Sequence, residues 1–233
     1  VTGSNLKDFI FKFCPLSNTL IRHFGAQILN AIEYLGAKGL IHCDLNPGNI
    51  MLTSEGRIKV IDFGMTIGIG GSHNIEKNGG LGVVAPEVHD GPLTPKADIW
   101  SWGMLMFVMA SDGNYPFRPE DKQNISMLWP LIQRRPDLMI VIEMALRRNV
   151  AQRADVAQLK SCMFFGNSID WNNVTSQSIP LLNESFARTV MIQQHLNSSV
   201  TILRSESIAA FEQGIANWER ACSRDMIDAV RVA

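Results

Sequence analysis

The longest periodic pattern of apolar residues begins at Asn18 and ends near Lys38. The apolar positions recur at spacings of three and four: Ile21, Phe24, Ile28, Ile32 and Leu35. This spacing places them on one stripe of an α-helix, because such a helix completes a turn every ~3.6 residues. Ser17 or Asn18 is suited to cap the first turn, and two glycines stand near the end. The pattern predicts one amphipathic helix between these ends.

Two short apolar runs follow this helix, at 50–52 and 58–61. The turn-forming stretch Thr53-Ser54-Glu55-Gly56 separates them. Short apolar runs joined by residues of this kind are typical of two antiparallel strands. The sequence therefore predicts a small β-hairpin directly after the long helix and its following loop.

The next part of the chain is predicted to be helix and loop. Apolar stretches predict helices at about 98–110, 136–146 and 154–163. The segment 64–82 is rich in Gly, Ser and Asn, which is typical of a mobile loop. The fold class predicted is therefore mainly α with a small β-hairpin.

The last segment, 167–233, has a different composition. It is first rich in Asn, Ser and Gln, and apolar residues then recur at helical spacing in two groups. The groups are Leu196, Val200 and Leu203, then Ile208, Phe211, Ile215, Trp218 and Cys222. This pattern predicts a helical pair that docks on the preceding unit or on a partner. We therefore divide the chain into two units, 1–166 and the tail, 167–233.

Composition is that of an ordinary globular protein. The 233 residues are 46% hydrophobic, enough to bury one good core and a second small unit. A formal net charge of −1 gives no reason to expect nucleic acid or an anionic membrane as a partner. The four cysteines lack zinc or disulfide spacing, so a reducing, cytoplasmic interior fits best. The most apolar run, 99–110, is too short for a transmembrane segment, and no signal-peptide pattern is present.

Candidate chemistry is concentrated in two short motifs. They are His42-Cys43-Asp44-Leu45-Asn46-Pro47-Gly48-Asn49 and Asp62-Phe63-Gly64. The carboxylates of Asp44 and Asp62 and the amide of Asn49 offer the oxygen ligands that Mg²⁺ prefers. Each motif alone is also good turn chemistry, so the prediction depends on both occurring together.

Together the two motifs resemble the catalytic loop, H-R-D-L-x-x-x-N, and the metal-binding loop, D-F-G, of the eukaryotic protein kinases. The resemblance implies that Asp44 accepts the proton of a substrate hydroxyl. It also implies that Asn49 and Asp62 bind Mg²⁺, which bridges the phosphates of ATP. Met51, on the predicted hairpin, would form the apolar floor beneath adenine. The partner implied is a protein, either a substrate or a binding partner. The structural members of the motifs would be His42, Phe63 and Gly64.

Three further motifs follow in the order of the kinase family. They are Ala85-Pro86-Glu87, Ala97-Asp98-Ile99-Trp100-Ser101-Trp102-Gly103 and Gly113-Asn114-Tyr115-Pro116-Phe117, which resemble A-P-E, D-x-W-S-x-G and G-x-x-P-F. By resemblance, Glu87 forms a buried ion pair with Arg153, and breaking such a pair costs about 3–5 kcal/mol. Asp98 would accept backbone N–H groups from the turn at His42 and Cys43. The resemblance covers roughly residues 4–166.

Three positions depart from the kinase pattern. Cys43 replaces an arginine that pairs with phosphate on the activation loop, so regulation by phosphorylation there is not expected. Asn46, a candidate catalytic residue, replaces the lysine that balances charge on the moving phosphate, and an amide carries no full charge. Gly80 replaces the threonine that meets this lysine. Pro47 nonetheless favours the serine/threonine class over the tyrosine class.

No segment before His42 resembles the Gly-rich loop, strand lysine and helix glutamate with which kinases grip ATP. We therefore expect a kinase-like C-terminal lobe whose N-terminal β lobe is absent, and the start at Val1 indicates a fragment. Losing one such donor costs about a hundredfold to a thousandfold in rate, so this chain alone is expected to be inactive. Three hypotheses stay open. They are the large lobe of a serine/threonine kinase, a pseudokinase that acts as an interaction module, and a degenerate fragment.

A faint second resemblance concerns the group of ER-stress sensor kinases and ribonuclease L. Residues 79–87 and 223–231 resemble two of its motifs. In that group the residues that cleave RNA come at or after this point. The sequence ends at Ala233 without them, so no RNA cleavage is expected.

Overall fold

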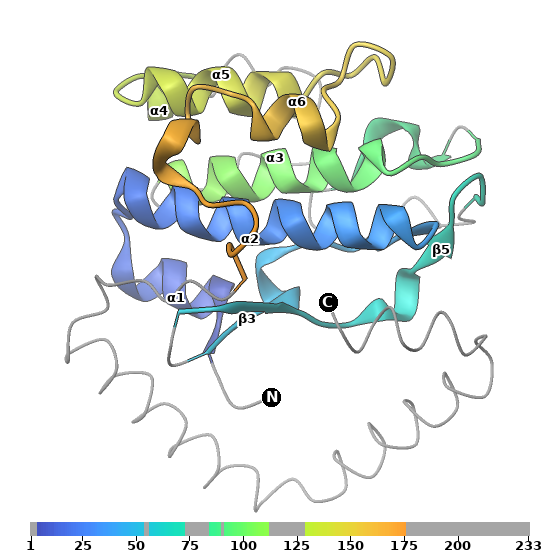
Figure 1. The fold of residues 1–233 in the computed structure, drawn as a ribbon, viewed down its shortest axis with the longest axis horizontal. Helices are drawn as coiled ribbons and strands as arrows, with labels where there is room; N and C mark the ends of the chain where they lie inside the picture. Colours follow the sequence, from blue (N-terminus) through green and yellow to red (C-terminus); the bar gives the residue numbers. More distant parts are fainter. Residues whose placement is uncertain (1–3, 54–55, 73–83, 90, 112–128, 176–233) are drawn as a thin grey trace, which may run out of the picture.

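The computed structural model describes residues 4–53, 56–72, 84–89, 91–111 and 129–175. In Figure 1 the helices lie in stacked rows, with α2 (Asn18–Ala37) and α3 (Lys96–Ala110) across the middle and α5 (Pro136–Ala145) above them. Helix α1 (Leu6–Phe13) and a small sheet lie below α2. The described part is therefore rich in helix with few strands, as the sequence predicts.

Helix α2 forms where the apolar stripe predicts it. The Ser17 side chain caps its first turn by accepting the N–H of Leu20 at 3.3 Å. All five residues of the predicted stripe are buried. Helix α2 packs closely on α3 at Gly25, where an added Cβ would lie 2.5 Å from the sulfur of Met106. This approach also lets Trp102 donate its ring N–H to the carbonyl of Gly25 at 2.8 Å.

Helix α3 is the centre of the core. It packs against both α2 and α5, and every residue from Ala97 to Ala110 is buried. Because the helix is apolar on nearly all sides, it has no face suited to solvent. Gly103 allows close packing on α5, since a Cβ there would lie 2.8 Å from the Cβ of Ala145. A rigid helix of this kind can position the few polar groups at its first turn.

The helices after α3 follow the prediction with one difference. Helix α5 matches the predicted 136–146, and α4 (Trp129–Ile132) precedes it. The helix predicted over 154–163 is limited to α6 (Val156–Lys160), and turns follow it. Asp155 begins α6 with a capping box, in which its side chain and backbone both bond the third helical residue.

The predicted hairpin is present as β3 (Ile50–Leu52) and β4 (Ile58–Val60), which pair antiparallel. The sequence did not predict β1 (Ser4–Asn5), which pairs antiparallel with the other edge of β3. Alternate residues of β3 are buried against the helices, so the remaining positions form an outer face. The residues in register across that face are Asn5, Met51 and Lys59.

A second sheet corrects the prediction of a mobile loop over 64–82. Phe63–Met65 forms a 3₁₀ turn, and β5 (Ile67–Gly68) pairs antiparallel with β2 (Leu40–Ile41). Gly70 and Gly71 then exchange backbone hydrogen bonds with Leu93, at 2.9 and 2.8 Å. The first part of this segment is therefore ordered by pairing with distant backbone. Residues 73–82 lie outside the described residues.

Two other predicted features also lie outside the described residues. They are the motif at 113–117 and the helical pattern between 196 and 222. Within the described ranges, no helix has both the length and the apolar character needed to cross a membrane.

Candidate active site

The carboxylate of Asp44 is held by two side-chain amides. Asn49 donates from Nδ2 to Asp44 Oδ2 at 2.8 Å, and Asn46 donates from Nδ2 to Asp44 Oδ1 at 3.1 Å. Both amides also donate to the backbone carbonyl of Asp44, at 2.9 and 3.2 Å. Each carboxylate oxygen thus receives one neutral donor, which fixes the orientation of the half-buried carboxylate and leaves acceptor capacity on both oxygens.

The two amides are themselves positioned by a 3₁₀ turn at Pro47–Asn49. Asn46 caps this turn by accepting the N–H of Gly48 on Oδ1 at 2.9 Å. The side chain of Asn49 uses its nitrogen for both hydrogen bonds to Asp44, so its oxygen is the atom available to a cation. The spacing Asp-x-Asn-x-x-Asn therefore produces one compact group of oxygen-bearing side chains.

Asp98 supports this loop from the first turn of α3. It is fully buried, and its two oxygens accept the backbone N–H groups of His42 at 2.7 Å and Cys43 at 2.9 Å. Burial raises the pKa of Asp98, while His42 and the two backbone bonds oppose that rise. These contacts are the ones the resemblance implies for Asp98.

Cys43 has a backbone conformation that a residue with a Cβ rarely adopts. Its φ is 66°, in the left-handed region, which costs a non-glycine residue on the order of 1–3 kcal/mol. The hydrogen bond from the Cys43 backbone N–H to Asp98 helps to offset this conformational cost. Burial, together with the nearby Asp98 and Asp44 charges, raises the pKa of the Cys43 thiol to about 12. The thiol is therefore neutral at pH 7 and supplies no charge to the site.

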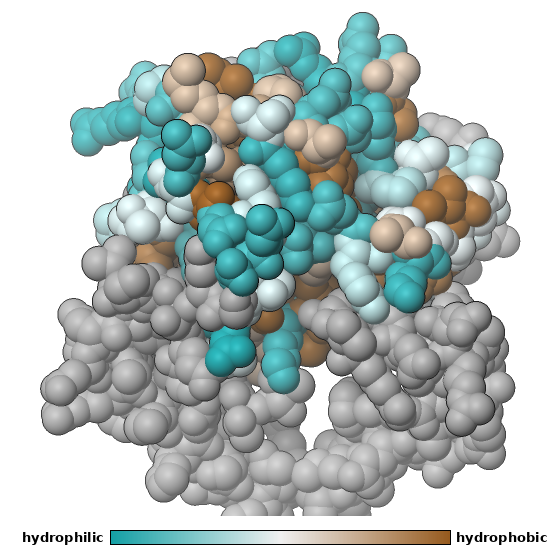
Figure 2. Space-filling view, viewed as in Figure 1, coloured by the Kyte–Doolittle hydropathy of each residue, from teal (hydrophilic) through white to brown (hydrophobic). Residues whose placement is uncertain are grey.

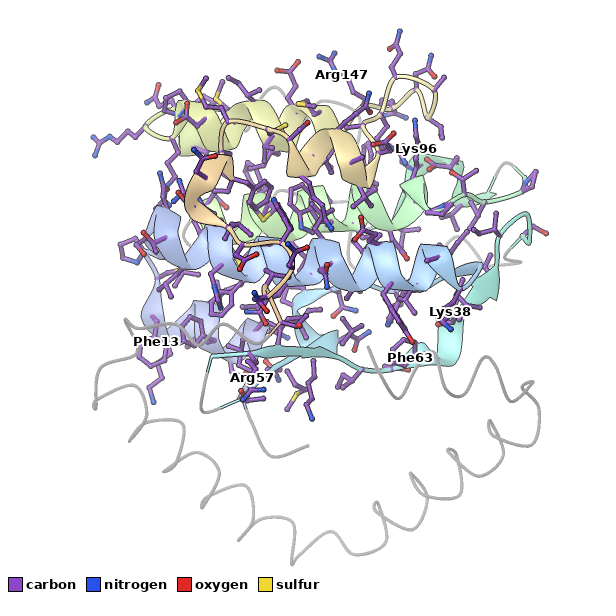
Figure 3. The ribbon with its side chains drawn as sticks, in the orientation of Figure 1. Phe13, Lys38, Arg57, Phe63, Lys96 and Arg147 are labelled. Atoms are coloured by element: carbon purple, nitrogen blue, oxygen red, sulfur yellow. The ribbon has the colours of Figure 1, made fainter. Side chains whose placement is uncertain are left out.

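The ring of His42 connects the two motifs. Its Nδ1 accepts the N–H of Asp44 at 3.2 Å, which leaves Nε2 as the nitrogen that donates. Nε2 then donates to the carbonyl of Ile61 at 3.2 Å, directly before Asp62. The ring also packs on that of Phe63, with centroids 4.9 Å apart. Figure 3 shows Phe63 below the end of α2, where it packs on an apolar cluster.

Asp62 is brought to the same loop by backbone contacts. The N–H of Ile61 donates to the carbonyl of Asn49 at 2.9 Å, so the two motifs are joined one residue before Asp62. Asp62 has a φ of 63° and accepts the N–H of Gly64 on Oδ1 at 3.3 Å. Its carboxylate is exposed. Asp44, Asn49 and Asp62 therefore belong to one connected unit.

Met51 is separate from this polar group. It is half-buried on the outer face of the small sheet, between Asn5 and Lys59. Its neighbours on β3, Ile50 and Leu52, are buried in the core. The structure thus leaves Met51 on a surface from which an apolar contact to another group can be made.

Glu87 and Arg153 form the ion pair that the resemblance implies. Arg153 donates to both carboxylate oxygens of Glu87, at 2.5 and 2.9 Å, and its side chain is fully buried. It also donates to the carbonyls of Lys96 and Arg147, at 2.7 and 2.9 Å. Its guanidinium lies 5.1 Å from the ring centroid of Trp100. These contacts tie the segment 84–89 to the start of α3.

The donor set fits a partly hydrated cation. Within the described ranges, no cluster of three or more His, Cys, Asp or Glu side chains forms a complete metal cage. The oxygens of Asp44, Asn49 and Asp62 are instead an open set. Mg²⁺ commonly binds to one or two carboxylates and completes its shell with water and phosphate oxygens.

The contact of Asn46 with Asp44 is the feature that sequence reasoning missed. In the sequence, Asn46 is notable because it replaces a positively charged lysine. In the structure, its amide donates a hydrogen bond directly to the Asp44 carboxylate. The sequence feature that could have predicted this hydrogen bond is the pair of Asn residues two and five positions after Asp44. Their side chains converge because the intervening Pro47 and Gly48 form a tight turn.

Comparison with known proteins gives the class of this chain. A family model described as the protein kinase domain matches residues 1–165. Because this is more than half of the 233 residues, the chain belongs to the protein kinase family. The resemblance inferred from the motifs is thereby confirmed.

Several curated relatives are protein kinases. 3-Phosphoinositide-dependent protein kinase B of Dictyostelium discoideum is 29% identical over 86% of this chain and 26% of its own length. 3-Phosphoinositide-dependent protein kinase 1 of Arabidopsis thaliana is 30% identical over 77% of this chain and 41% of its own length. The RAC family serine/threonine-protein kinase homolog of Dictyostelium discoideum is 32% identical over 77% and 43%, respectively. The chain thus spans less than half the length of these relatives.

Proposed function

We propose that this chain is the large, C-terminal lobe of a serine/threonine protein kinase, which transfers phosphate from ATP to a protein hydroxyl when a small lobe completes it. In this proposal residues 1–166 form the lobe and 167–233 form a helical tail. The proposal rests chiefly on one observation. The Asp44 carboxylate accepts a hydrogen bond from the side chain of Asn49, and the backbone carbonyl of Asn49 accepts one from Ile61, the residue before Asp62.

Each residue then has a defined role. Asp44 orients the acceptor hydroxyl and takes its proton as the hydroxyl oxygen bonds to phosphorus and the bond to the ADP oxygen breaks. The oxygens of Asn49 and Asp62 would hold Mg²⁺, and Met51 would support adenine. Bound Mg²⁺ and ATP supply the phosphoryl group and the neutralising charge.

A second candidate function is a pseudokinase that works as an interaction module. One observation favours it: Cys43, directly before Asp44, and Asn46, two positions after it, are both uncharged. The neutral amides of Asn46 and Asn49 orient the Asp44 carboxylate, but they do not balance the charge on a phosphoryl group during its transfer. Nucleotide binding without phosphoryl transfer would fit this function.

The test is a phosphoryl-transfer assay on the full-length protein that contains this chain. The assay uses radiolabelled ATP, Mg²⁺ and a mixture of peptides that carry Ser, Thr or Tyr. We expect label on Ser or Thr, and a loss of about a hundredfold or more in Asp44→Asn. Asp137→Asn, an exposed change on α5, is the matched control and should keep its activity.

Two outcomes distinguish the candidates. Full activity in Asp44→Asn would rule out Asp44 as the base. A rise in melting temperature with ATP and Mg²⁺, without transfer to any peptide, would instead support the interaction module.

A further inference from the structure

Two polar side chains lie on the otherwise apolar buried face of α2. They are His23 and Gln27, which stand one turn apart and are 8% and 2% exposed. Figure 2 shows the more usual place of polar residues: hydrophilic residues, in teal, cover much of the described surface on the face in view. A buried polar group needs a hydrogen-bond partner, because it has lost its contact with water. Both side chains find their partners at the start of β4.

Gln27 uses both ends of its amide to bond the backbone there. Its Oε1 accepts the N–H of Ile58 at 3.0 Å, and its Nε2 donates to the carbonyl of Gly56 at 3.4 Å. The ring of His23 donates to the same carbonyl of Gly56. Two consecutive turns of α2 therefore hold one short stretch of the hairpin.

These backbone groups belong to the free edge of the sheet. The strand order is β1-β3-β4, so β4 has a neighbouring strand on one side only. The carbonyl of Arg57, a residue labelled in Figure 3, accepts the N–H of Thr53 on the β3 side. Backbone groups of a strand alternate between its two sides, so the N–H of Ile58 points to the free edge. The amide of Gln27 takes the place of a neighbouring strand at that edge.

The same edge strand leads into the candidate active site. Helix α2 packs on α3, which supports the loop that carries Asp44. Strand β4 ends at Val60, two residues before Asp62. Between them, the N–H of Ile61 donates to the carbonyl of Asn49 at 2.9 Å. A side chain that holds β4 on α2 therefore also bears on where Asp62 lies relative to Asn49.

We propose that Gln27 is a positioning residue for Asp62. By pairing with the free edge of β4, it keeps the chain from Ile58 to Asp62 in place, so that Asp62 and Asn49 can share one divalent cation. Gln27 itself contacts neither motif, so its loss removes no ligand of the cation. The statement about the cation rests on the proposed function, whereas the statement about the backbone does not.

Hydrogen exchange followed by NMR in the 233-residue chain tests the backbone statement. Gln27→Met keeps a side chain of similar length but removes the amide donor and acceptor. We expect the N–H of Ile61 to exchange roughly tenfold faster in this variant, relative to the N–H of Leu105 in the middle of α3. The ratio is used because a general loss of stability also reaches the buried helix. An unchanged ratio would overturn the proposal.

Ile28→Val is the matched control. Ile28 is the next residue on α2 and is fully buried, and its replacement removes one methyl group without touching the amide of Gln27. It should leave the exchange ratio as it is in the unaltered chain. A ratio that rises as much in Ile28→Val as in Gln27→Met would assign the effect to the stability of α2 and would also overturn the proposal.

Binding of Mn²⁺ tests the statement about the cation. Mn²⁺ accepts the same oxygen ligands as Mg²⁺, and its free form can be followed by electron paramagnetic resonance. In the full-length protein with ATP, Gln27→Met should weaken Mn²⁺ binding by about threefold to tenfold, and Ile28→Val should not. Equal, measurable affinity in Gln27→Met and the unaltered protein would overturn the positioning role. Faster exchange at Ile61 in a protein that binds no Mn²⁺ would support the backbone statement and count against the proposed function.

Discussion

The buried carboxylate of Asp98 accepts the N–H of Cys43 at 2.9 Å, and Cys43 has a left-handed backbone conformation. The two residues are 55 positions apart in the sequence. Asp98 belongs to the first turn of a helix that is buried on all sides. The conformation of the loop that carries Asp44 therefore depends on a carboxylate of the buried helix α3.

Replacing Asp98 should destabilise the fold. In Asp98→Ala the N–H groups of His42 and Cys43 lose their partner, and an unsatisfied buried donor costs about 1–3 kcal/mol. Asp98→Asn keeps one acceptor oxygen and should cost less than Asp98→Ala. Urea unfolding at pH 7 measures both variants, with Arg134→Gln as an exposed control that should change stability by less than about 0.5 kcal/mol. Equal stability of Asp98→Ala and the control would show that the two bonds contribute nothing.

The two partners of the Glu87–Arg153 ion pair should differ in how much their substitution destabilises the fold. The Arg153 side chain is fully buried, whereas that of Glu87 is 19% exposed. Glu87→Gln strands a buried charge and should cost about 3–5 kcal/mol. Arg153→Met should cost at least as much, because it also removes the donors to the carbonyls of Lys96 and Arg147.

A double-mutant cycle checks this pair. Glu87→Gln combined with Arg153→Met leaves neither charge, so its loss of unfolding free energy should be smaller than the sum of the single losses. Denaturant unfolding of the three variants gives the coupling energy. Strict additivity would mean that the two side chains do not interact in solution.

Local patterns explain why the helices were predictable. Helix α2 was predicted because its stripe and its cap lie within one stretch of sequence. Strands β1 and β2 have two residues each, and so short a strand has no period to detect. Their partners, β3 and β5, lie 26 or more positions away. The pairing is therefore decided by tertiary packing, which single-sequence patterns do not report.

The candidate site also has features that local motifs predict and features that they do not predict. The identities of Asp44, Asn49 and Asp62 were visible as motifs, and so were the partners of Asp98 and Glu87. The hydrogen bond from Asn46 to Asp44 was not predicted, because it forms only when the turn at Pro47–Asn49 brings the Asn46 side chain back toward Asp44. The positive φ of Cys43 was not predicted either, because it is uncommon for a cysteine.

Asn46 gives a prediction about the proposed activity. In the full-length protein, Asn46→Ala removes one of the two amides that orient the Asp44 carboxylate. We expect kcat to fall by about tenfold to a hundredfold with little change in the KM for ATP, because the bond concerns the acceptor side. Asn46→Lys restores a cation and should raise kcat. Steady-state kinetics with one Ser or Thr peptide measure both. A lower kcat in Asn46→Lys would show that the neutral amide is required.

Acid stability depends on a histidine away from the site. His23, on α2, is buried and donates from its ring to the carbonyl of Gly56, while its Nε2 has no partner among the described residues. Burial lowers the pKa of His23 below its ordinary value of 6.5. The folded state therefore keeps this ring neutral at pH values where the unfolded chain already binds a proton.

The resulting stability is fully present above pH 6.5 and is lost as pH falls from there through the folded pKa of His23. His23→Asn retains a donor near the position of Nδ1 but cannot titrate in this range. We expect the variant to be less stable than the unaltered chain at pH 7.5, because it fills less of the core. Between pH 7 and 5, however, its free energy of unfolding should fall less steeply. Urea unfolding in steps of half a pH unit compares the two slopes, and parallel slopes would assign the acid sensitivity to other groups.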